Sequence, residues 1–186
     1  MTWRVDPVSG WLKGARRVPS PNCDERPAGT EISLLVIHGI SLPPNEFGGE
    51  EIDRLFTNQL NPAAHPYFRD IHQLRVSSHL LIRRDGEVVQ YVPFTKRAWH
   101  AGESCYDERT CCNDFSIGIE LEGSDDIPYE TKQYEVLQAL IELLRKSYPA
   151  IGPHAIVGHC HIAPGRKTDP GPSFEWARIG INEPQA

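Results

Sequence analysis

Three short runs of apolar and branched residues constrain the fold of this chain more than any other feature. They occupy residues 31–38, 115–121 and 154–159. Apolar runs of this length, flanked by glycine and loop residues, predict buried strands. The longer segment 130–147 repeats apolar residues at helical spacing and ends before a proline, which predicts a helix. Strands interspersed with a few helices predict an α/β fold with a central mixed β-sheet flanked by helices.

Two further segments add detail to this architecture. Residues 50–60 place apolar side chains on one helical face, which predicts a second, shorter helix. Residues 78–84 and 87–92 are separated by Asp85 and Gly86, and an Asp-Gly pair favours the positive φ angles of a tight hairpin turn.

The whole chain, residues 1–186, is expected to form a single domain, because 186 residues supply one hydrophobic core and are too few for two ordinary ones. Residues 1–30 are rich in proline and glycine and predict an ordered but irregular N-terminal arm. Residues 179–186 are expected to form a short C-terminal tail.

Composition limits the partners and the compartment. A formal net charge of −6 argues against a nucleic-acid-binding protein, which usually carries a basic face. The sequence contains no run of eighteen apolar residues, so no membrane span is predicted. The first twenty residues lack the apolar core of a signal peptide. An odd set of five cysteines favours free thiols. We therefore expect a cytoplasmic protein that does not bind a membrane.

Two of the predicted strands end in a histidine that is followed by a loop. His38 precedes Gly39, and His159 precedes a loop that is long enough to bring Asp169 back over the strand end. Two imidazoles and one carboxylate suit catalytic zinc, because three protein ligands leave the fourth position for water. The spacing alone also fits two buried structural histidines and a solvated aspartate.

Metal-assisted hydrolysis also needs a proton carrier and a group that stabilises an oxyanion. If 116–122 is a buried strand, Ile117 and Ile119 face one side while Gly118 and Glu120 face the other. A buried carboxylate requires a partner or a role, so Glu120 is either a catalytic group or half of a structural ion pair. Lys167 is a candidate for the group that stabilises the oxyanion, although most lysines in loops are only solvated.

Several motifs occur together and in order. They are residues 34–38 with 41–44, then 97–102, 113–123, 158–160 and 166–171. Over about residues 10–176 the chain resembles the N-acetylmuramoyl-L-alanine amidases with the peptidoglycan-recognition-protein fold. Within that family it is most similar to the cytoplasmic branch that acts on 1,6-anhydro-N-acetylmuramyl peptides during cell-wall recycling.

The resemblance implies a role for each candidate residue. His38, His159 and Asp169 match the zinc ligands of the family. Glu120 matches the carboxylate that takes a proton from water and passes it to the leaving amine, and Lys167 matches the cation that stabilises the tetrahedral intermediate. The implied reaction is hydrolysis of the amide between anhydro-N-acetylmuramic acid and L-alanine, by a monomeric enzyme. A role in limiting β-lactamase-inducing muropeptides follows from the same resemblance.

Aspartate as the third ligand is itself informative, because phage amidases and animal recognition proteins of this fold generally use a cysteine there. The sequence departs from the family pattern at three positions beside the predicted site. Gly39 replaces a usual Asn, His161 replaces Asp or Asn, and Gly165 replaces a common Glu. We expect these changes to alter the support of the metal, and His161 is a competing candidate ligand.

Four more residues are candidates for binding the sugar or the peptide: Arg75, Trp99, His100 and Arg166. Arginine pairs with carboxylates in a bidentate manner, and an indole packs on a sugar face. Surface arginines and a core tryptophan are the alternative interpretation.

The cysteines do not form a second predicted metal site. Cys105, Cys111 and Cys112 lack zinc-binding spacing and are expected to be spare thiols near a loop. If the strand at 154–159 continues, Cys160 points away from the ligands and is a core thiol.

Two rival functions remain open from the sequence. One is a module that binds peptidoglycan fragments without cutting them, and the other is a secreted amidase that degrades the polymeric wall. An intact ligand set with Glu120 argues against the first, and the missing signal segment argues against the second.

Overall fold

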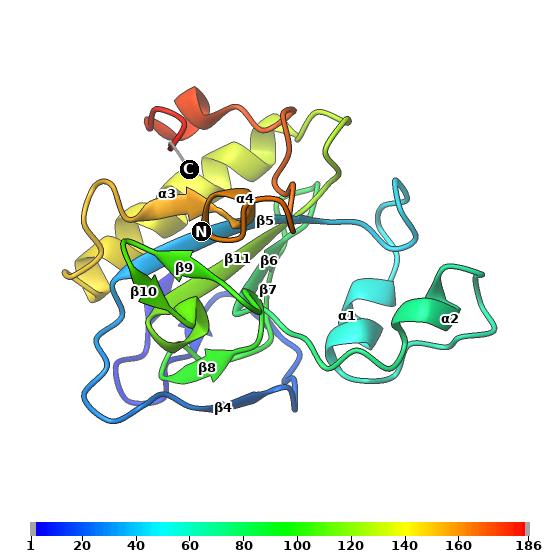
Figure 1. Ribbon diagram of the computed structural model, residues 1–186, viewed down its shortest axis with the longest axis horizontal. Helices are drawn as coiled ribbons and strands as arrows, with labels where there is room; N and C mark the ends of the chain where they lie inside the picture. Colours follow the sequence, from blue (N-terminus) through cyan, green and yellow to red (C-terminus); the bar gives the residue numbers. More distant parts are fainter. Residues whose placement is uncertain (1–2, 185–186) are drawn as a thin grey trace.

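The structure is a computed structural model that describes residues 3–184 (Figure 1). Its strands are β1 (Arg4–Val5), β2 (Leu12–Lys13), β3 (Arg16–Arg17), β4 (Cys23–Glu25), β5 (Leu34–Ile40), β6 (Leu80–Ile82), β7 (Val88–Gln90), β8 (Lys96–Ala98), β9 (Cys105–Tyr106), β10 (Arg109–Thr110), β11 (Ser116–Glu122) and β12 (Ile156–Gly158). Its helices are α1 (Glu51–Phe56), α2 (Phe68–Ile71), α3 (Thr131–Ser147) and α4 (His159–Ile162), with short 3₁₀ helices η1 (Cys112–Asp114) and η2 (Trp176–Ile179).

A six-stranded sheet in the order β12-β5-β11-β6-β7-β3 forms the centre of the domain. Strands β12, β5, β11 and β6 run parallel to one another. Strand β7 is antiparallel to β6, and β3 is parallel to β7. This mixed sheet confirms the predicted fold class. In such a sheet the carboxyl ends of the parallel strands share one edge, where sites are usually built.

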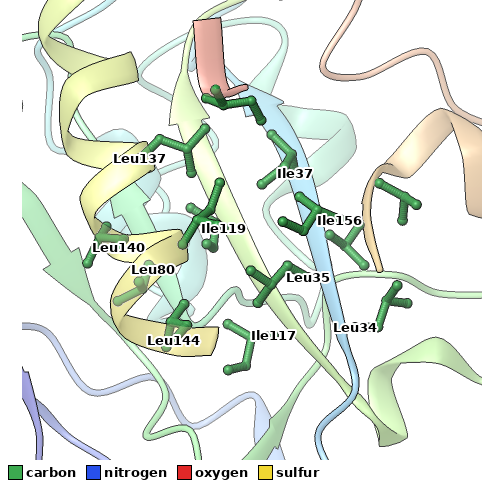
Figure 2. Close-up of a cluster of buried hydrophobic side chains, with 14 of the residues drawn as sticks. Leu34, Leu35, Ile37, Leu80, Ile117, Ile119, Leu137, Leu140, Leu144 and Ile156 are labelled. Atoms are coloured by element: carbon green, nitrogen blue, oxygen red, sulfur yellow. The ribbon is translucent and has the colours of Figure 1, made fainter. Parts of the chain in front are cut away.

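Helix α3 covers one face of the sheet, as Figure 2 shows for its leucine stripe. Ile117 and Ile119 of β11 are the register partners of Leu35 and Ile37 of β5, so all four side chains leave the same face. All four are fully buried. Full burial of each such side chain contributes about 1.5–3 kcal/mol to stability.

The opposite face carries a second apolar cluster, in which Tyr91, the residue after β7, packs edge-on against Phe56 of α1. Helix α1 is shorter than the predicted 50–60. It ends at Phe56 because Asn58 adopts a left-handed conformation with φ of 61°, which a helix cannot continue through. The segment that carries α1 and α2 extends to one side of the sheet (Figure 1).

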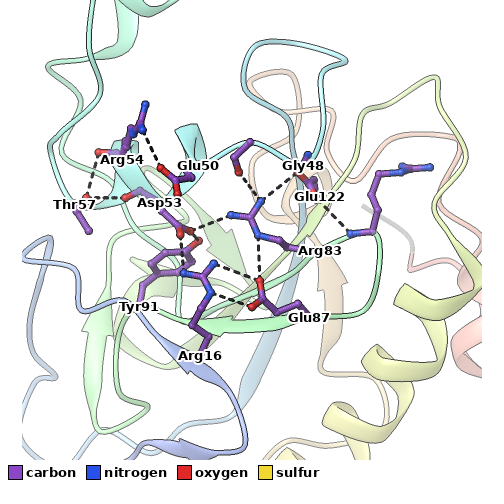
Figure 3. A network of polar contacts seen from close by, with 12 residues as sticks. Arg16, Gly48, Glu50, Asp53, Arg54, Thr57, Arg83, Glu87, Tyr91 and Glu122 are labelled. Atoms are coloured by element: carbon purple, nitrogen blue, oxygen red, sulfur yellow. Dashed lines mark hydrogen bonds and ion pairs between the residues drawn. The ribbon is translucent and has the colours of Figure 1, made fainter.

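A charged network ties α1 and the sheet together (Figure 3). The Arg83 guanidinium lies 3.4 Å from Asp53 of α1 and 3.4 Å from Glu122 at the end of β11. The Glu122 carboxylate also accepts a hydrogen bond of 2.6 Å from the Gly48 backbone N–H. The loop between β5 and α1 is thereby fixed to the sheet edge that carries the strand ends.

Three local predictions need correction. The N-terminal arm is not irregular, because it holds four short strands, and β3 joins the edge of the main sheet beside β7. In the hairpin, only Gly86 has positive φ. The Gly86 N–H donates to Arg83 and the Arg83 N–H donates to Glu87, so three residues form the turn, with Gly86 at its left-handed position.

The third correction concerns the end of the last strand. Strand β12 ends at Gly158, and His159 is the first residue of α4 rather than the last of a strand. Cys160 therefore does not follow strand alternation, and it is half-buried instead of being a core thiol.

Within residues 3–184, no helix combines the length and the apolar character that a bilayer span requires. The predicted C-terminal tail begins inside η2, and its residues 185–186 lie outside the described residues.

Candidate metal and catalytic site

Three ligand-type atoms converge at the carboxyl ends of β5 and β12. His38 Nδ1 lies 3.0 Å from His159 Nδ1, and each of these nitrogens lies 3.1 Å from Asp169 Oδ2. In a tetrahedral zinc site with bonds of about 2.0–2.1 Å, ligand atoms are separated by roughly 3.3 Å. The observed triangle is close to that spacing, so the structure brings together the three residues that the sequence singled out.

The sheet places the two histidines beside each other. In the parallel pair β12–β5, Gly158 is the register partner of Ile37, so the next residues, His159 and His38, meet at the same sheet edge. The loop after α4 then returns over this edge, because the Cys160 N–H donates a hydrogen bond of 2.9 Å to the carbonyl of Asp169. The aspartate is thereby placed across from both imidazoles.

The donor set fits a cation. His159 Nε2 lies 3.1 Å from the carbonyl oxygen of Ala101, which can only accept, so the ring proton sits on Nε2 and leaves Nδ1 bare. A proton placed between two of the three converging atoms forms only one hydrogen bond and leaves the third atom without a partner. A single cation can bind all three atoms at once. His38, His159 and Asp169 are also the only group of three such residues close enough to share an ion within the described part of the chain.

The charge state of the ligands agrees with this fit. Burial, with a smaller contribution from His159, lowers the pKa of His38 to about 4, so its ring is neutral at pH 7. Burial raises the pKa of Asp169, but its hydrogen bonds with His159 and His38 lower that pKa more strongly, and the carboxylate stays ionised. A neutral imidazole and an ionised carboxylate are the forms in which these two side chains bind a metal.

Glu120 is a buried carboxylate on β11. It is the register partner of His38 across β11 and β5, and only 8% of it is exposed. Its Oε2 is buried and has no hydrogen-bond partner among the described residues 3–184. Burial, followed by the charge of Asp169, raises the pKa of Glu120 well above its ordinary value. Among residues 3–184, no Lys, Arg or His side chain lies within ion-pair distance of Glu120, although the charge of Lys167 acts on it from farther away and lowers its pKa slightly.

These residues open onto a cleft of about 490 Å³. His38, Glu120, His159, Lys167 and Asp169 all line it. The side facing the α1–α2 segment is mainly apolar; its residues are Leu42, Leu55, Phe56, Tyr67, Ile71, Leu74 and Val76. A cleft with one polar wall, which carries the three converging ligand-type side chains, and one apolar wall suits a ligand that has both polar and apolar parts.

Comparison with known proteins places the chain in a family. Residues 28–172 match the family model described as N-acetylmuramoyl-L-alanine amidase. The chain belongs to the N-acetylmuramoyl-L-alanine amidase family. The 1,6-anhydro-N-acetylmuramyl-L-alanine amidase AmpD of Citrobacter freundii is 64% identical over 170 residues, which cover 91% of this chain and 90% of that protein.

Solved structures agree with this assignment. A crystal structure of a selenomethionine derivative of AmpD superposes with a TM-score of 0.90 at 63% identity, covering 92% of this chain and 96% of the other. A complex of the Escherichia coli amidase AmiD with the substrate anhydro-N-acetylmuramic acid-L-Ala-D-γ-Glu-L-Lys has a TM-score of 0.59 at 30% identity. That alignment covers 84% of this chain and 60% of AmiD.

The four predicted substrate-binding residues are dispersed in this amidase. Trp99 and His100 line the cleft. The exposed Arg75 instead donates to the carbonyls of Gln73 and Leu74. Their contact with substrate stays a prediction.

Arg166 connects two loops of the amidase beside the cleft. Its Nη2 donates hydrogen bonds of 2.6 Å to the carbonyl of Ala101 and 2.5 Å to that of Glu103. The carbonyl of Ala101 also accepts the proton of His159 Nε2. In this structure the Arg166 guanidinium therefore supports a predicted ligand, and its predicted contact with substrate remains untested.

The three departures from the family pattern have structural roles. His161 accepts a hydrogen bond of 2.9 Å from the Gly158 N–H through Nδ1, and its ring packs against Trp176. It lies outside the three-residue metal group of the described chain. Gly165 occupies an exposed turn with φ of 75°, a conformation that favours glycine over glutamate.

At Gly39, a Cβ atom would lie 2.3 Å from the hydroxyl oxygen of Tyr129. That hydroxyl donates a hydrogen bond of 2.8 Å to the carbonyl of Pro170, next to Asp169. Tyr129 is thus part of the support of the amidase site, a role that was not predicted from the sequence. Nothing in its local pattern marks it, since it precedes α3 as an isolated aromatic residue.

Proposed function

We propose that this amidase hydrolyses the amide between the lactyl group of 1,6-anhydro-N-acetylmuramic acid and L-alanine of the stem peptide, with a zinc ion held by His38, His159 and Asp169. The observation that carries the proposal is the convergence of these three ligands beside Glu120, a buried carboxylate with no hydrogen-bond partner at Oε2. A binding module has no need for an unpartnered buried carboxylate next to such a group, because burial of a charge without a role costs stability.

Each residue has a definite task in this scheme. When bound, zinc supplies a Lewis acid that polarises the scissile carbonyl and makes a water more acidic. Glu120, whose pKa is raised by burial, takes the proton of the attacking water and delivers it to the departing nitrogen of L-alanine. The C–N bond breaks as that nitrogen is protonated, and the products are a free acid on the sugar and a free peptide amine.

Lys167 supplies the positive charge for the oxyanion. It lies on the loop between α4 and Asp169, is exposed, and lines the cleft beside the proposed ligands. Its backbone N–H donates a hydrogen bond of 3.1 Å to Ala163, which fixes the loop at its base. A cation held at the rim of a narrow, partly apolar cleft stabilises developing negative charge more strongly than one in open water.

The substrate class rests on the relatives. AmpD of C. freundii is named for the anhydromuramyl amide, and a solved structure of AmiD of E. coli holds an anhydromuramyl tripeptide as substrate. We infer that the cleft takes the same kind of small muropeptide and that the enzyme works in the cytoplasm on fragments recovered from the wall. The control of β-lactamase-inducing muropeptides follows from that role.

Mass spectrometry of anhydro-N-acetylmuramyl tripeptide, incubated with the purified zinc-loaded protein, tests the proposal. We expect free tripeptide and anhydro-N-acetylmuramic acid, and no cleavage when a zinc chelator is present. Intact substrate in both incubations would favour the binding module instead. Equal cleavage of polymeric wall and of the small fragment would favour the wall-degrading alternative.

A further inference from the structure

His100 is enclosed behind the proposed metal ligands, with 8% of its surface exposed. Its ring lies over Gly118 of β11, where a Cβ atom would be 2.5 Å from His100 Cγ. Its backbone N–H donates a hydrogen bond of 3.1 Å to Asn113 Oδ1. Ring and backbone are therefore both fixed, and the absence of a side chain at Gly118 creates the space for the imidazole.

Both ring nitrogens of His100 have partners. Nδ1 lies 2.9 Å from His38 Nε2, and Nε2 lies 3.1 Å from Ser116 Oγ. The three side chains form one chain of contacts that runs from the proposed metal ligand into the interior. Ser116 and Gly118 belong to the same strand, β11, that also carries Glu120.

Only one placement of the protons on His38, His100 and Ser116 allows His38 to bind a metal through Nδ1. A neutral histidine that binds a metal through Nδ1 must carry its proton on Nε2. His38 Nε2–H therefore donates to His100 Nδ1, which must be bare. The neutral His100 ring then carries its proton on Nε2 and donates to Ser116 Oγ.

We propose that His100 is a positioning residue that orients the His38 ring and holds its proton on Nε2, so that Nδ1 is free for the metal. His159 has a comparable partner in the carbonyl of Ala101. The inference rests on the proposed metal site and goes beyond it, because it gives His100 the role of supporting the ligand His38 rather than of binding the substrate. Outer partners of this kind typically change metal affinity 10–100-fold when they are removed.

Zinc affinity of three variants, measured by competition with a chromophoric chelator, tests the proposal. His100→Leu fills the space without offering a hydrogen-bond acceptor to His38. His100→Asn retains a side-chain oxygen that can accept the His38 proton. Ser116→Ala removes only the contact at the far side of His100. We expect affinity to fall about 10–100-fold in the leucine variant and less in the other two. The free energy of unfolding of each metal-free variant is measured in parallel.

The order of the variants separates positioning from packing. If affinity follows unfolding stability rather than the presence of an acceptor, or if His100→Leu binds zinc like the parent protein, the proposal is overturned. Asp169→Ala serves as the reference for the metal site itself. Should that variant retain zinc, the proposed function fails, and this result is distinguishable from a failure of the His100 assignment.

Nitrogen-15 NMR of histidine-labelled, zinc-loaded protein gives a direct readout of the proton positions. We expect His38 to carry its proton on Nε2 and His100 to carry its proton on Nε2 as well. A proton on His100 Nδ1 contradicts the proposal, because His100 would then donate to His38 instead of accepting from it.

Discussion

Glu120 and His38 are register partners on the adjacent parallel strands β11 and β5, and their side chains leave the same face of the sheet. The sheet itself therefore sets the position of the proposed proton carrier relative to the proposed metal ligand. A rigid arrangement of this kind requires no loop movement to align the two groups. The consequences can be tested at individual positions.

Glu120→Gln should lower kcat by about 10²–10⁴-fold, because the amide cannot accept and deliver a proton. Zinc content should not change, since Glu120 is not one of the three converging ligands. Turnover of the anhydromuramyl tripeptide and metal analysis of the same preparation measure both quantities. An unchanged kcat would show that Glu120 is structural.

The same substitution should change the pH dependence of stability in the metal-free protein. Burial raises the pKa of Glu120 above its value in the unfolded chain, so the contribution of Glu120 is favourable at low pH and is lost as the pH rises. The Gln side chain does not titrate. The free energy of unfolding of Glu120→Gln, relative to that of the parent protein, should therefore increase as the pH rises from about 4 towards 8.

Urea unfolding in the presence of a chelator, at several pH values across that range, measures this difference. A difference that stays constant with pH would mean that Glu120 has the same pKa in the folded and unfolded states.

Glu122→Gln provides a matched contrast on the same strand. Glu122 is also buried, but its carboxylate accepts hydrogen bonds from the Gly48 and Arg84 backbone N–H groups and pairs with Arg83 (Figure 3). Its replacement should cost about 1–3 kcal/mol of stability and leave kcat far less affected than Glu120→Gln. Thermal and urea unfolding, with turnover measured well below the melting temperature, check both expectations.

Asp169→Ala should abolish zinc retention and activity together. Two imidazoles alone give an incomplete site, and the carboxylate contacts both of them. Metal analysis after dialysis, with circular dichroism to confirm folding, gives the result. Full activity of a metal-free preparation would contradict the whole scheme.

Much of the fold could be predicted from local patterns. The strand that carries Ile117 and Ile119, the long helix and the hairpin could be predicted because an apolar run, apolar residues at helical spacing and an Asp-Gly pair are local properties of the chain. The boundaries were less accurate, because His159 begins a helix instead of ending a strand and Asn58 ends α1 early. Such ends depend on single residues and on what packs against them.

The candidate site, like the fold, could be predicted from the sequence only in part. The sequence by itself determined the chemistry: two imidazoles near the ends of predicted strands, a loop carboxylate, a carboxylate inside an apolar strand, and a family resemblance that links them. Only the tertiary structure decided that His100 lies behind His38 and that the Tyr129 hydroxyl holds Pro170.

The physical reason is that these contacts join residues far apart in the sequence. His38 and His159 are separated by 121 positions, and Tyr129 and Pro170 by 41. No periodicity in the chain reports which side chains will meet after the sheet has formed. Their meeting depends on the strand order β12-β5-β11 and on the return of the 163–171 loop over the sheet edge, both of which are properties of the packed domain.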